Sequence, residues 1–454
     1  KKNITKVFFL FLLFHLSLWT FIPTISNINL PLDTIEALAW GSNLDWGFNK
    51  HPPFSAFAVE VFYIIFGSND WSYYLLSQIF VIVAFVYVWK FSNEIFEEKI
   101  YSLLSVLILS GIYFYNFTTP EFNVNICQIP FWSLAVYFCW KSIKENKIKD
   151  WVLFGFFSGL GFLSKYLFIY LLIGLKVLFL YIIKKERKFN LNYLIPSFVF
   201  LATVMPHLIW LAQNEYSTVL YALNRTGLED SSISNHLLNP VIFILKQIGI
   251  LIPFIILGLI LIKFSKFKIN LKDKKLLFLL TINFLPIILI ILTSLITGAK
   301  IRTMWMTPFY LFSGVIFIYL FQKKIDVKKI NKFFVVFLFL LILSPVTYLY
   351  ISISESDKRT DYPGKEIARL VQNKWDNNFR NEIKIVIGDE WSAGNLSYHL
   401  NSRPLWTNSL QNKTSIIDSN KGVIYTGNPK ILKKLCPGVF GKIYRVGYCM
   451  IGQR

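Results

Sequence analysis

The sequence alternates long apolar blocks with short lysine-rich connections, and this pattern limits the chain to membrane folds. Several blocks reach the roughly 20 residues that cross a bilayer as a helix. The blocks lie near residues 7–25, 74–92, 101–118, 126–142, 151–165, 167–183, 192–213, 239–263, 276–298, 304–322 and 332–352. Charged residues make up only 16% of the chain, against about 25% in soluble domains. The sequence therefore predicts an α-helical polytopic membrane protein with about eleven transmembrane helices.

The basic residues of the connections predict how the chain is oriented in the membrane. The connections at 90–100, 141–150, 184–189, 263–275 and 323–332 carry 21 Lys and Arg residues, and those of the other side carry five when the C-terminal tail is left out. Because basic connections stay in the cytoplasm, this bias predicts a cytoplasmic N-terminus and, after eleven spans, a periplasmic tail. The run at 7–25 lacks a following cleavage motif and is interpreted as an uncleaved first span in the inner membrane.

The net charge of +21 does not by itself indicate a nucleic-acid partner. The basic residues separate apolar blocks, and no basic stripe interleaved with aromatic residues occurs. The chain also contains no P-loop, no dinucleotide-binding fingerprint and neither a G-x-S-x-G nor an H-E-x-x-H motif. We therefore expect membrane lipids around the protein, no nucleic acid and no required cofactor.

The composition divides the chain into two domains. Residues 1–353 form the predicted transmembrane domain, with long outer loops at 26–73 and 214–238, and residues 354–454 have the composition of a soluble domain. In the soluble domain, the patterns predict helices at Lys365–Trp375, Trp391–Leu400 and Pro429–Leu435 and strands at Glu382–Gly388, Gly422–Gly427 and Lys442–Ile451. This alternation indicates a small α/β unit. Its Cys436 and Cys449 can pair if the unit faces an oxidising compartment, and otherwise stay as thiols.

Two carboxylates in the first outer loop are the candidate catalytic groups. Asp33 and Glu36 stand three residues apart, so on a helix they share a face. A carboxylate beside basic groups can act as a general base when its pKa suits proton abstraction. The same spacing also fits a helix start, with Asp33 as the cap and Glu36 three residues later. Spacing alone leaves both interpretations open.

Five basic side chains on the predicted outer side are candidate ligands of a phosphate. Lys50 and His51 precede Pro52 and Pro53, whose rings stiffen the backbone, although the same segment also fits a helix start. Lys165 interrupts an apolar block, which is costly unless the charge has a partner, a function or access to the interface. Lys300 and Arg302 lie where the positive-inside trend disfavours cations, which favours an anionic ligand.

Three further polar residues are candidate substrate-binding groups. Glu121 and Asn123 lie in the second outer loop, where they suit sugar hydroxyls or, alternatively, a loop that ends in a helix cap. His207 stands near the outer end of a helix, and a structural hydrogen-bonded role fits it better than metal ligation because no second ligand accompanies it. No set of side chains requires a metal, although the chemistry is compatible with a divalent ion.

Taken together, these segments resemble the polyprenyl-phosphate-dependent, C-type glycosyltransferases. The likeness is to the bacterial branch related to protein O-mannosyltransferases and lipid A aminoarabinose transferase. It rests on the segments Asp33–Pro53, Thr119–Glu121, Gly159–Tyr166 (Gly-Leu-x-x-Leu-Ser-Lys-Tyr) and Pro206–Trp210 (Pro-His-x-x-Trp). The resemblance covers residues 1–350 and implies an inverting transfer of a sugar from a polyprenyl-phosphate carrier to an envelope acceptor, such as lipid A or another glycan.

The resemblance also implies that a first-loop aspartate deprotonates the acceptor. Many relatives carry adjacent Asp and Glu residues at this place, whereas here Ile35 precedes Glu36 and the aspartate is Asp33. Asp33 is thus the first candidate for the base, with Glu36 orienting the acceptor or a basic neighbour. A flippase for lipid-linked saccharides and an envelope scaffold fit the same architecture, but neither needs a carboxylate at a reaction centre.

Overall fold

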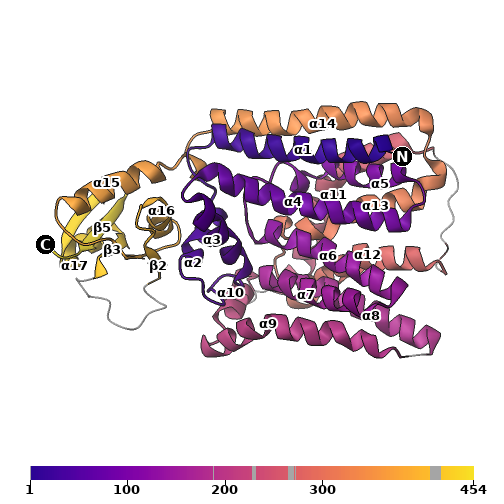
Figure 1. The fold of residues 1–454 in the computed structure, drawn as a ribbon, viewed down its shortest axis with the longest axis horizontal. Coiled ribbons are helices and arrows are strands. Elements are labelled where there is room, and N and C mark those ends of the chain that lie inside the picture. The colour runs from indigo at the N-terminus through magenta and orange to yellow at the C-terminus, as the bar shows by residue number, and fades with distance from the viewer. Residues whose placement is uncertain (1, 188, 228–231, 264–269, 271, 409–420) are drawn as a thin grey trace.

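The computed structural model describes residues 2–187, 189–227, 232–263, 270, 272–408 and 421–454. Within these residues, long helices lie side by side, and a small domain with a β-sheet sits at one end of the bundle (Figure 1). The bundle helices are α1 (Lys2–Ser26), α4 (Asp70–Ile95), α5 (Lys99–Leu107), α6 (Val124–Glu145), α7 (Ile148–Ser164), α8 (Ile169–Glu186), α9 (Ile195–Gln213), α11 (Asn235–Leu261), α12 (Lys274–Thr297), α13 (Ser313–Phe321) and α14 (Val327–Ser354). The predicted fold class, a helical membrane bundle with a small C-terminal α/β domain, is confirmed.

Each predicted apolar block contains a helix, but not all of the described helices reach membrane-spanning length. Seven of the described helices are long and apolar enough to span, and an eighth span results if the bent pair Thr303–Tyr310 and Ser313–Lys324 crosses as one unit. The block at 101–118 breaks after α5 into two short 3₁₀ turns, Ile108–Gly111 and Tyr113–Tyr115. The count of eleven spans, and the orientation that depends on it, therefore stay predictions.

Helix α6 forms the centre of the bundle. Its side chains are buried along most of its length, including Trp132 with no exposed surface, and it packs against α4 and α7. The side chain of Asn123 caps this helix by accepting hydrogen bonds from the N–H groups of Asn125 and Ile126, at 2.9 and 3.1 Å. Asn123 thus has the capping role that the sequence left open.

Three short helices stand at the end of the bundle that faces the C-terminal domain. They are α2 (Leu32–Gly41), α3 (Phe54–Phe66) and α10 (Ser217–Arg225). Helix α2 follows Pro31, and no side chain caps its N-terminus. Asp33 lies in the first turn of α2 without capping it, so the interpretation of Asp33 as a helix cap is wrong. The proline-rich segment Lys50–Pro53 leads into α3, which begins at Phe54.

The C-terminal domain contains a five-stranded sheet with the strand order β2-β1-β3-β5-β4. Strands β2 (Leu405–Thr407), β1 (Ile385–Ile387) and β3 (Val423–Gly427) are parallel, and β5 (Val446–Ile451) and β4 (Val439–Ile443) continue the sheet as an antiparallel hairpin. Helices α15 (Gly364–Asp376), α16 (Ser392–His399) and α17 (Pro429–Leu435) match the predicted helices.

Two details of this domain differ from the sequence prediction. The single final strand expected over Lys442–Ile451 is wrong, because the chain turns at Tyr444, whose φ is 51°, and the segment contributes to both β4 and β5. Strand β2 was not predicted, since its three residues are too short for a recognisable alternation. Cys436 and Cys449 form a disulfide, with their Cα atoms 5.5 Å apart.

Candidate active site

The candidate site forms where the first outer loop meets the second. Helix α2 is anchored there by the hydroxyl of Thr34, which donates to the carbonyl of Phe122 at 3.1 Å. The backbone N–H of Asp33 donates to Oε1 of Glu121 at 3.2 Å. Two acidic side chains that lie 88 residues apart in the sequence are therefore neighbours in the fold.

Asp33 and Glu121 share an environment that favours their protonated forms. Burial raises the pKa of Asp33, against the opposing effect of Lys165, Lys50, Arg225 and Arg302. Burial also raises the pKa of Glu121, and the charge of Asp33 raises it further, to about 8. Because like charges in a desolvated site do not ionise independently, we expect one carboxyl group of the pair, Glu121, to keep its proton near neutral pH.

Lys50 lies between two carboxylates. Its Nζ atom is 2.8 Å from Oε1 of Glu36 and 3.3 Å from Oε1 of Glu390, a residue of the C-terminal domain. Burial lowers the pKa of Lys50, but the bond to Glu36 and the charge of Glu390 raise it more, so that the net shift is upward. Lys50 is therefore a stable cation, and Glu36 is engaged as its partner.

His51 is adjacent to these groups but does not add to their positive charge. Burial and the neighbouring cations Lys165, Lys50 and Arg225 lower the pKa of His51 to about 3. The imidazole is therefore neutral at physiological pH and offers a hydrogen bond without a net charge. This differs from the expectation that His51 would help to neutralise a phosphate.

Lys165 reaches the site because the chain breaks between α7 and α8. The residue has an extended backbone, with φ −164° and ψ 135°, between the last turn of α7 and the 3₁₀ turn Tyr166–Phe168. Lys165 is 7% exposed, and its Nζ donates to Oδ1 of Asn125 at 2.5 Å and lies 5.2 Å from the ring centroid of Trp305. The chain thus forms separate helices on the two sides of Lys165, as the separate apolar blocks at 151–165 and 167–183 predict, and Lys165 has the polar partner that its burial requires.

A cavity of about 270 Å³ opens beside these groups. Its lining combines basic groups with aromatic and aliphatic side chains: Lys50, His51, Pro52, Lys165, Tyr166, Leu167, Ile169, Tyr170, Tyr221, Ala222, Arg225, Thr226 and Trp305. A smaller cavity, lined by Asp33, Glu36, His51 and Asn123 among others, lies next to it. The two cavities share His51, so that the acidic and the basic groups face adjoining spaces. This arrangement suits a ligand with an anionic head and an apolar chain.

The remaining predicted site residues lie at different distances from this centre. Arg302 is exposed but close enough for its charge to act on both Asp33 and Lys165. Lys300 is exposed and is not among the residues that line the cavity, and its backbone N–H donates to the carbonyl of Thr226 at 3.0 Å. The structure therefore brings Lys50 and Lys165 together on the cavity wall, leaves Arg302 outside it to act through its charge, and leaves Lys300 at the periphery.

The imidazole of His207 hydrogen-bonds to the first outer loop. Its Nδ1 lies 2.6 Å from the carbonyl oxygen of Trp46 and its Nε2 lies 2.7 Å from the hydroxyl of Tyr166. Both ring nitrogens are thus used in hydrogen bonds, as a structural histidine requires. Among the described residues, no three His, Cys, Asp or Glu side chains are grouped so that they could hold a metal ion.

Two residues of the site were not among the sequence candidates. Arg225, at the end of α10, lines the cavity and acts on the charge of Asp33. It could have been chosen as one of the few cations on the predicted outer side. Glu390 gave no local signal, because its proximity to Lys50 arises only from the packing of the C-terminal domain against the first loop.

Comparison with known proteins finds a family and a relative that are similar to part of this chain. Residues 50–210 match the family described as dolichyl-phosphate-mannose-protein mannosyltransferase. Over 157 residues the chain is 29% identical to the undecaprenyl phosphate-alpha-4-amino-4-deoxy-L-arabinose arabinosyl transferase of Wigglesworthia glossinidia brevipalpis. The resemblance predicted from the sequence is confirmed. The matched segment covers 33% of this chain and 27% of that relative's length.

Two crystal structures of ArnT from Cupriavidus metallidurans have the same fold as this chain. The structure bound to undecaprenyl phosphate has a TM-score of 0.66 over 99% of this chain and 98% of the other, at 11% sequence identity. The apo structure has a TM-score of 0.63, covers 98% of both chains and is also 11% identical. The likeness therefore includes the C-terminal domain as well as the helical bundle.

Proposed function

We propose that the protein is an inverting glycosyltransferase that moves a sugar from a polyprenyl-phosphate carrier to an envelope acceptor. In this proposal it is an inner-membrane protein whose N-terminus is cytoplasmic and whose site and C-terminal domain are periplasmic. The acceptor is lipid A or another envelope glycan. The observation that carries the proposal is Asp33, which is bonded to Glu121 and lines a small cavity that adjoins the cavity with Lys50, Lys165 and Arg225 on its wall.

The chemistry of the transfer needs these two kinds of group. The acceptor hydroxyl attacks the anomeric carbon from the side opposite the carrier phosphate and loses its proton to a base. A bond forms between the acceptor oxygen and the anomeric carbon, while the bond from that carbon to the phosphate oxygen breaks. The electron pair stays on the phosphate, whose growing charge is stabilised by cations that the fold holds in place. No nucleotide takes part in this step.

Among the first-loop carboxylates, Asp33 fits the base best. Glu36 is occupied by its 2.8 Å ion pair with Lys50, and so it fits a positioning role. Burial raises the pKa of Asp33 toward the range in which a carboxylate is an effective general base. Glu121, with a pKa of about 8, is a protonated acid at neutral pH and suits a hydrogen bond to a sugar hydroxyl.

The cavity suits the carrier. Lys50 and Arg225 offer charge to the phosphate, and Arg302 adds positive charge from its exposed position. Burial lowers the pKa of Lys165 to about 7, and a phosphate anion beside it would favour its protonated form. Leu167, Ile169 and Tyr170 line the apolar part that would take the first units of a polyprenyl chain. The similar ArnT structure from Cupriavidus metallidurans holds undecaprenyl phosphate, which supports a carrier of this chemical class here.

The proposal is tested by measuring transfer in proteoliposomes that contain a polyprenyl-phosphate sugar donor and a lipid A acceptor. Asp33→Asn should lower the rate by about 10²-fold or more, since it removes the base. Asp45→Asn is the matched control, because Asp45 is an exposed carboxylate of the same loop, and it should retain the wild-type rate. Transfer should also persist in excess EDTA. Full activity of Asp33→Asn, or sugar movement across the membrane without a new glycosidic bond, would contradict the proposal.

A further inference from the structure

The C-terminal domain contributes a charged group to the candidate site. Glu390 lies between β1 and α16, at the carboxyl end of a strand in the parallel part of the sheet. This is the edge at which loops of parallel sheets usually carry functional groups. Its carboxylate is 13% exposed and lies 3.3 Å from Nζ of Lys50.

The C-terminal domain packs closely against the first outer loop. Helix α16 packs against α2, and a Cβ atom added at Gly394 would lie only 3.1 Å from Cβ of Ala39 and 3.3 Å from Cγ2 of Ile35. The absence of a side chain at Gly394 therefore permits the close approach of the two helices. Glu390 and Glu36 are thus held on facing elements around a single ammonium group.

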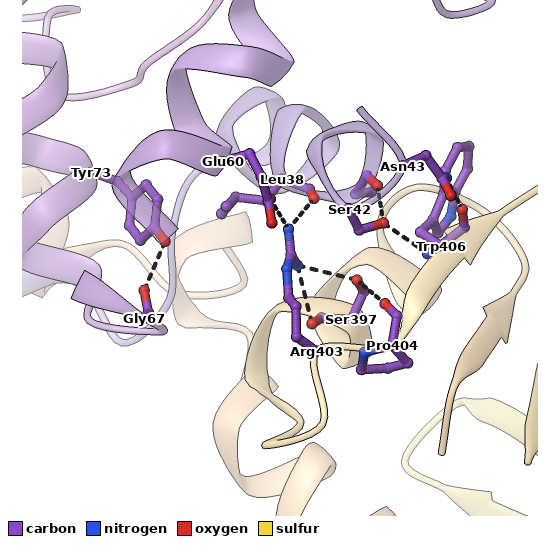
Figure 2. A network of polar contacts seen from close by, with 11 residues as sticks. Leu38, Ser42, Asn43, Glu60, Gly67, Tyr73, Ser397, Arg403, Pro404 and Trp406 are labelled. Carbon is purple, nitrogen blue, oxygen red and sulfur yellow. Dashed lines mark hydrogen bonds and ion pairs between the residues drawn. The ribbon is translucent and has the colours of Figure 1, made fainter. Parts of the chain in front are cut away.

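A second set of contacts holds the same interface, as Figure 2 shows. The guanidinium of Arg403 donates to Oε2 of Glu60 at 2.5 Å and to the carbonyl of Leu38 at 2.7 Å. On the same side, the backbone N–H of Trp406 donates to Oγ of Ser42 at 2.8 Å. Because these bonds connect the C-terminal domain to both α2 and α3, the domain that carries Glu390 cannot move away from the first loop without breaking them.

We propose that Glu390 is a positioning residue for Lys50 that competes with the carrier phosphate and so weakens the binding of both the donor and the spent carrier. This inference rests on the proposed function, in which Lys50 binds that phosphate. In the empty site, Glu36 and Glu390 together hold the ammonium group. When a phosphate arrives, it meets a cation that is already shared by two anions, and it is repelled by the charge of Glu390. The C-terminal domain would therefore help to release the lipid phosphate after transfer.

The expected size of the effect follows from Coulomb's law. Two unit anions on opposite sides of one ammonium group lie about 6 Å apart. Their repulsion weakens phosphate affinity about threefold in bulk water and about a hundredfold at an effective dielectric constant of about 20. Removing the charge of Glu390 should therefore tighten phosphate binding by at least about threefold. Salt should reduce the difference, because the groups are partly open to solvent.

The experiment measures the dissociation constant of undecaprenyl phosphate, and the KM for the donor, with the full-length protein in nanodiscs. Glu390→Gln should lower both values by about threefold or more, whereas Glu390→Asp, which keeps the charge, should stay near the wild type. Glu366→Gln is the matched control, because Glu366 is an exposed carboxylate of the same domain and does not contact Lys50.

The outcomes separate this inference from the function on which it rests. If Lys50→Gln weakens binding while Glu390→Gln tightens it, both are supported. If Lys50→Gln weakens binding but Glu390→Gln leaves it unchanged or weaker, the competition is refuted and the phosphate site stands. If Lys50→Gln has no effect on binding, the phosphate site itself is wrong. A merely structural role of Glu390 predicts weaker binding in Glu390→Gln, which is the opposite sign.

Discussion

Replacing Arg403 with methionine should release the C-terminal domain from the first outer loop. The side chain of Arg403 is 14% exposed and that of its partner Glu60 is 11% exposed. Besides Glu60 and the Leu38 carbonyl, the guanidinium contacts the carbonyl and hydroxyl of Ser397, both at 3.1 Å, and lies 4.1 Å from the ring centroid of Tyr63. Methionine preserves much of the aliphatic volume but none of these polar contacts.

The magnitude follows from the charge that is left behind. Removing one partner of a buried ion pair costs about 3–5 kcal/mol, because the other charge stays buried without compensation. Each 1.4 kcal/mol is a factor of ten in an equilibrium constant. If separation of the two domains exposes the amides of α2, the protection of those amides from hydrogen exchange should fall by about a hundredfold to a few thousandfold.

Hydrogen exchange of the protein in nanodiscs, followed by mass spectrometry of peptides that cover α2, checks this value. A double variant, Arg403→Met with Glu60→Gln, should regain part of the lost protection, because it no longer buries an unpaired carboxylate. Arg369→Met is the control, since Arg369 is an exposed arginine of the same domain, and should change protection little. A loss below about tenfold in Arg403→Met, or a double variant that loses the sum of both single effects, would refute the reasoning.

Three further predictions concern the site and the C-terminal domain. Glu121 has a pKa of about 8, so above that pH it ionises and loses the proton with which it would donate to a sugar hydroxyl. Transfer should decline there, and the pH–rate profile of Glu121→Gln should lack that decline. Cys436→Ser should destabilise the C-terminal domain by about 3 kcal/mol, as expected for a loop of this length, and reductant should leave the thermal midpoint of the variant unchanged while lowering that of the wild type. Gly394→Val should separate α16 from α2 and reduce transfer. Gly249→Ala should be tolerated, because the space around this glycine is open. Equal activities of the two variants would contradict the packing argument.

Much of the fold could be predicted because its signals are local. The apolar blocks and their lysine-rich ends depend on which residues tolerate a bilayer, so each helix can be recognised without knowledge of its neighbours. The helix at 429–435 was predicted with its exact bounds, since Asn428 caps it and Pro429 suits its first turn. The final hairpin was missed because nothing in the alternation of its residues marks the turn at Tyr444.

The site was predictable only in part, because only some of its signals are local. Asp33, Lys50 and Lys165 could be chosen one by one, because a charged group in or near an apolar segment needs a partner or a function. Sequence could not tell whether Asp33 capped a helix or faced a cavity, since both interpretations fit the same spacing. Nor could it tell that His51 is neutral, because its pKa is lowered first by burial and then by cations that include Lys165 and Arg225, from two distant parts of the chain.

The sequence by itself determined that this chain is a membrane-embedded helical bundle with a small α/β domain, and which side chains could carry chemistry. Tertiary structure alone decided the pairings: Asp33 with Glu121, Glu36 and Glu390 on Lys50, and Arg403 with Glu60. Hydropathy and helix formation act over one or two turns, and so they can be recognised along the chain. Ion pairs and hydrogen bonds form through space, over a few ångströms, between groups that only packing brings together.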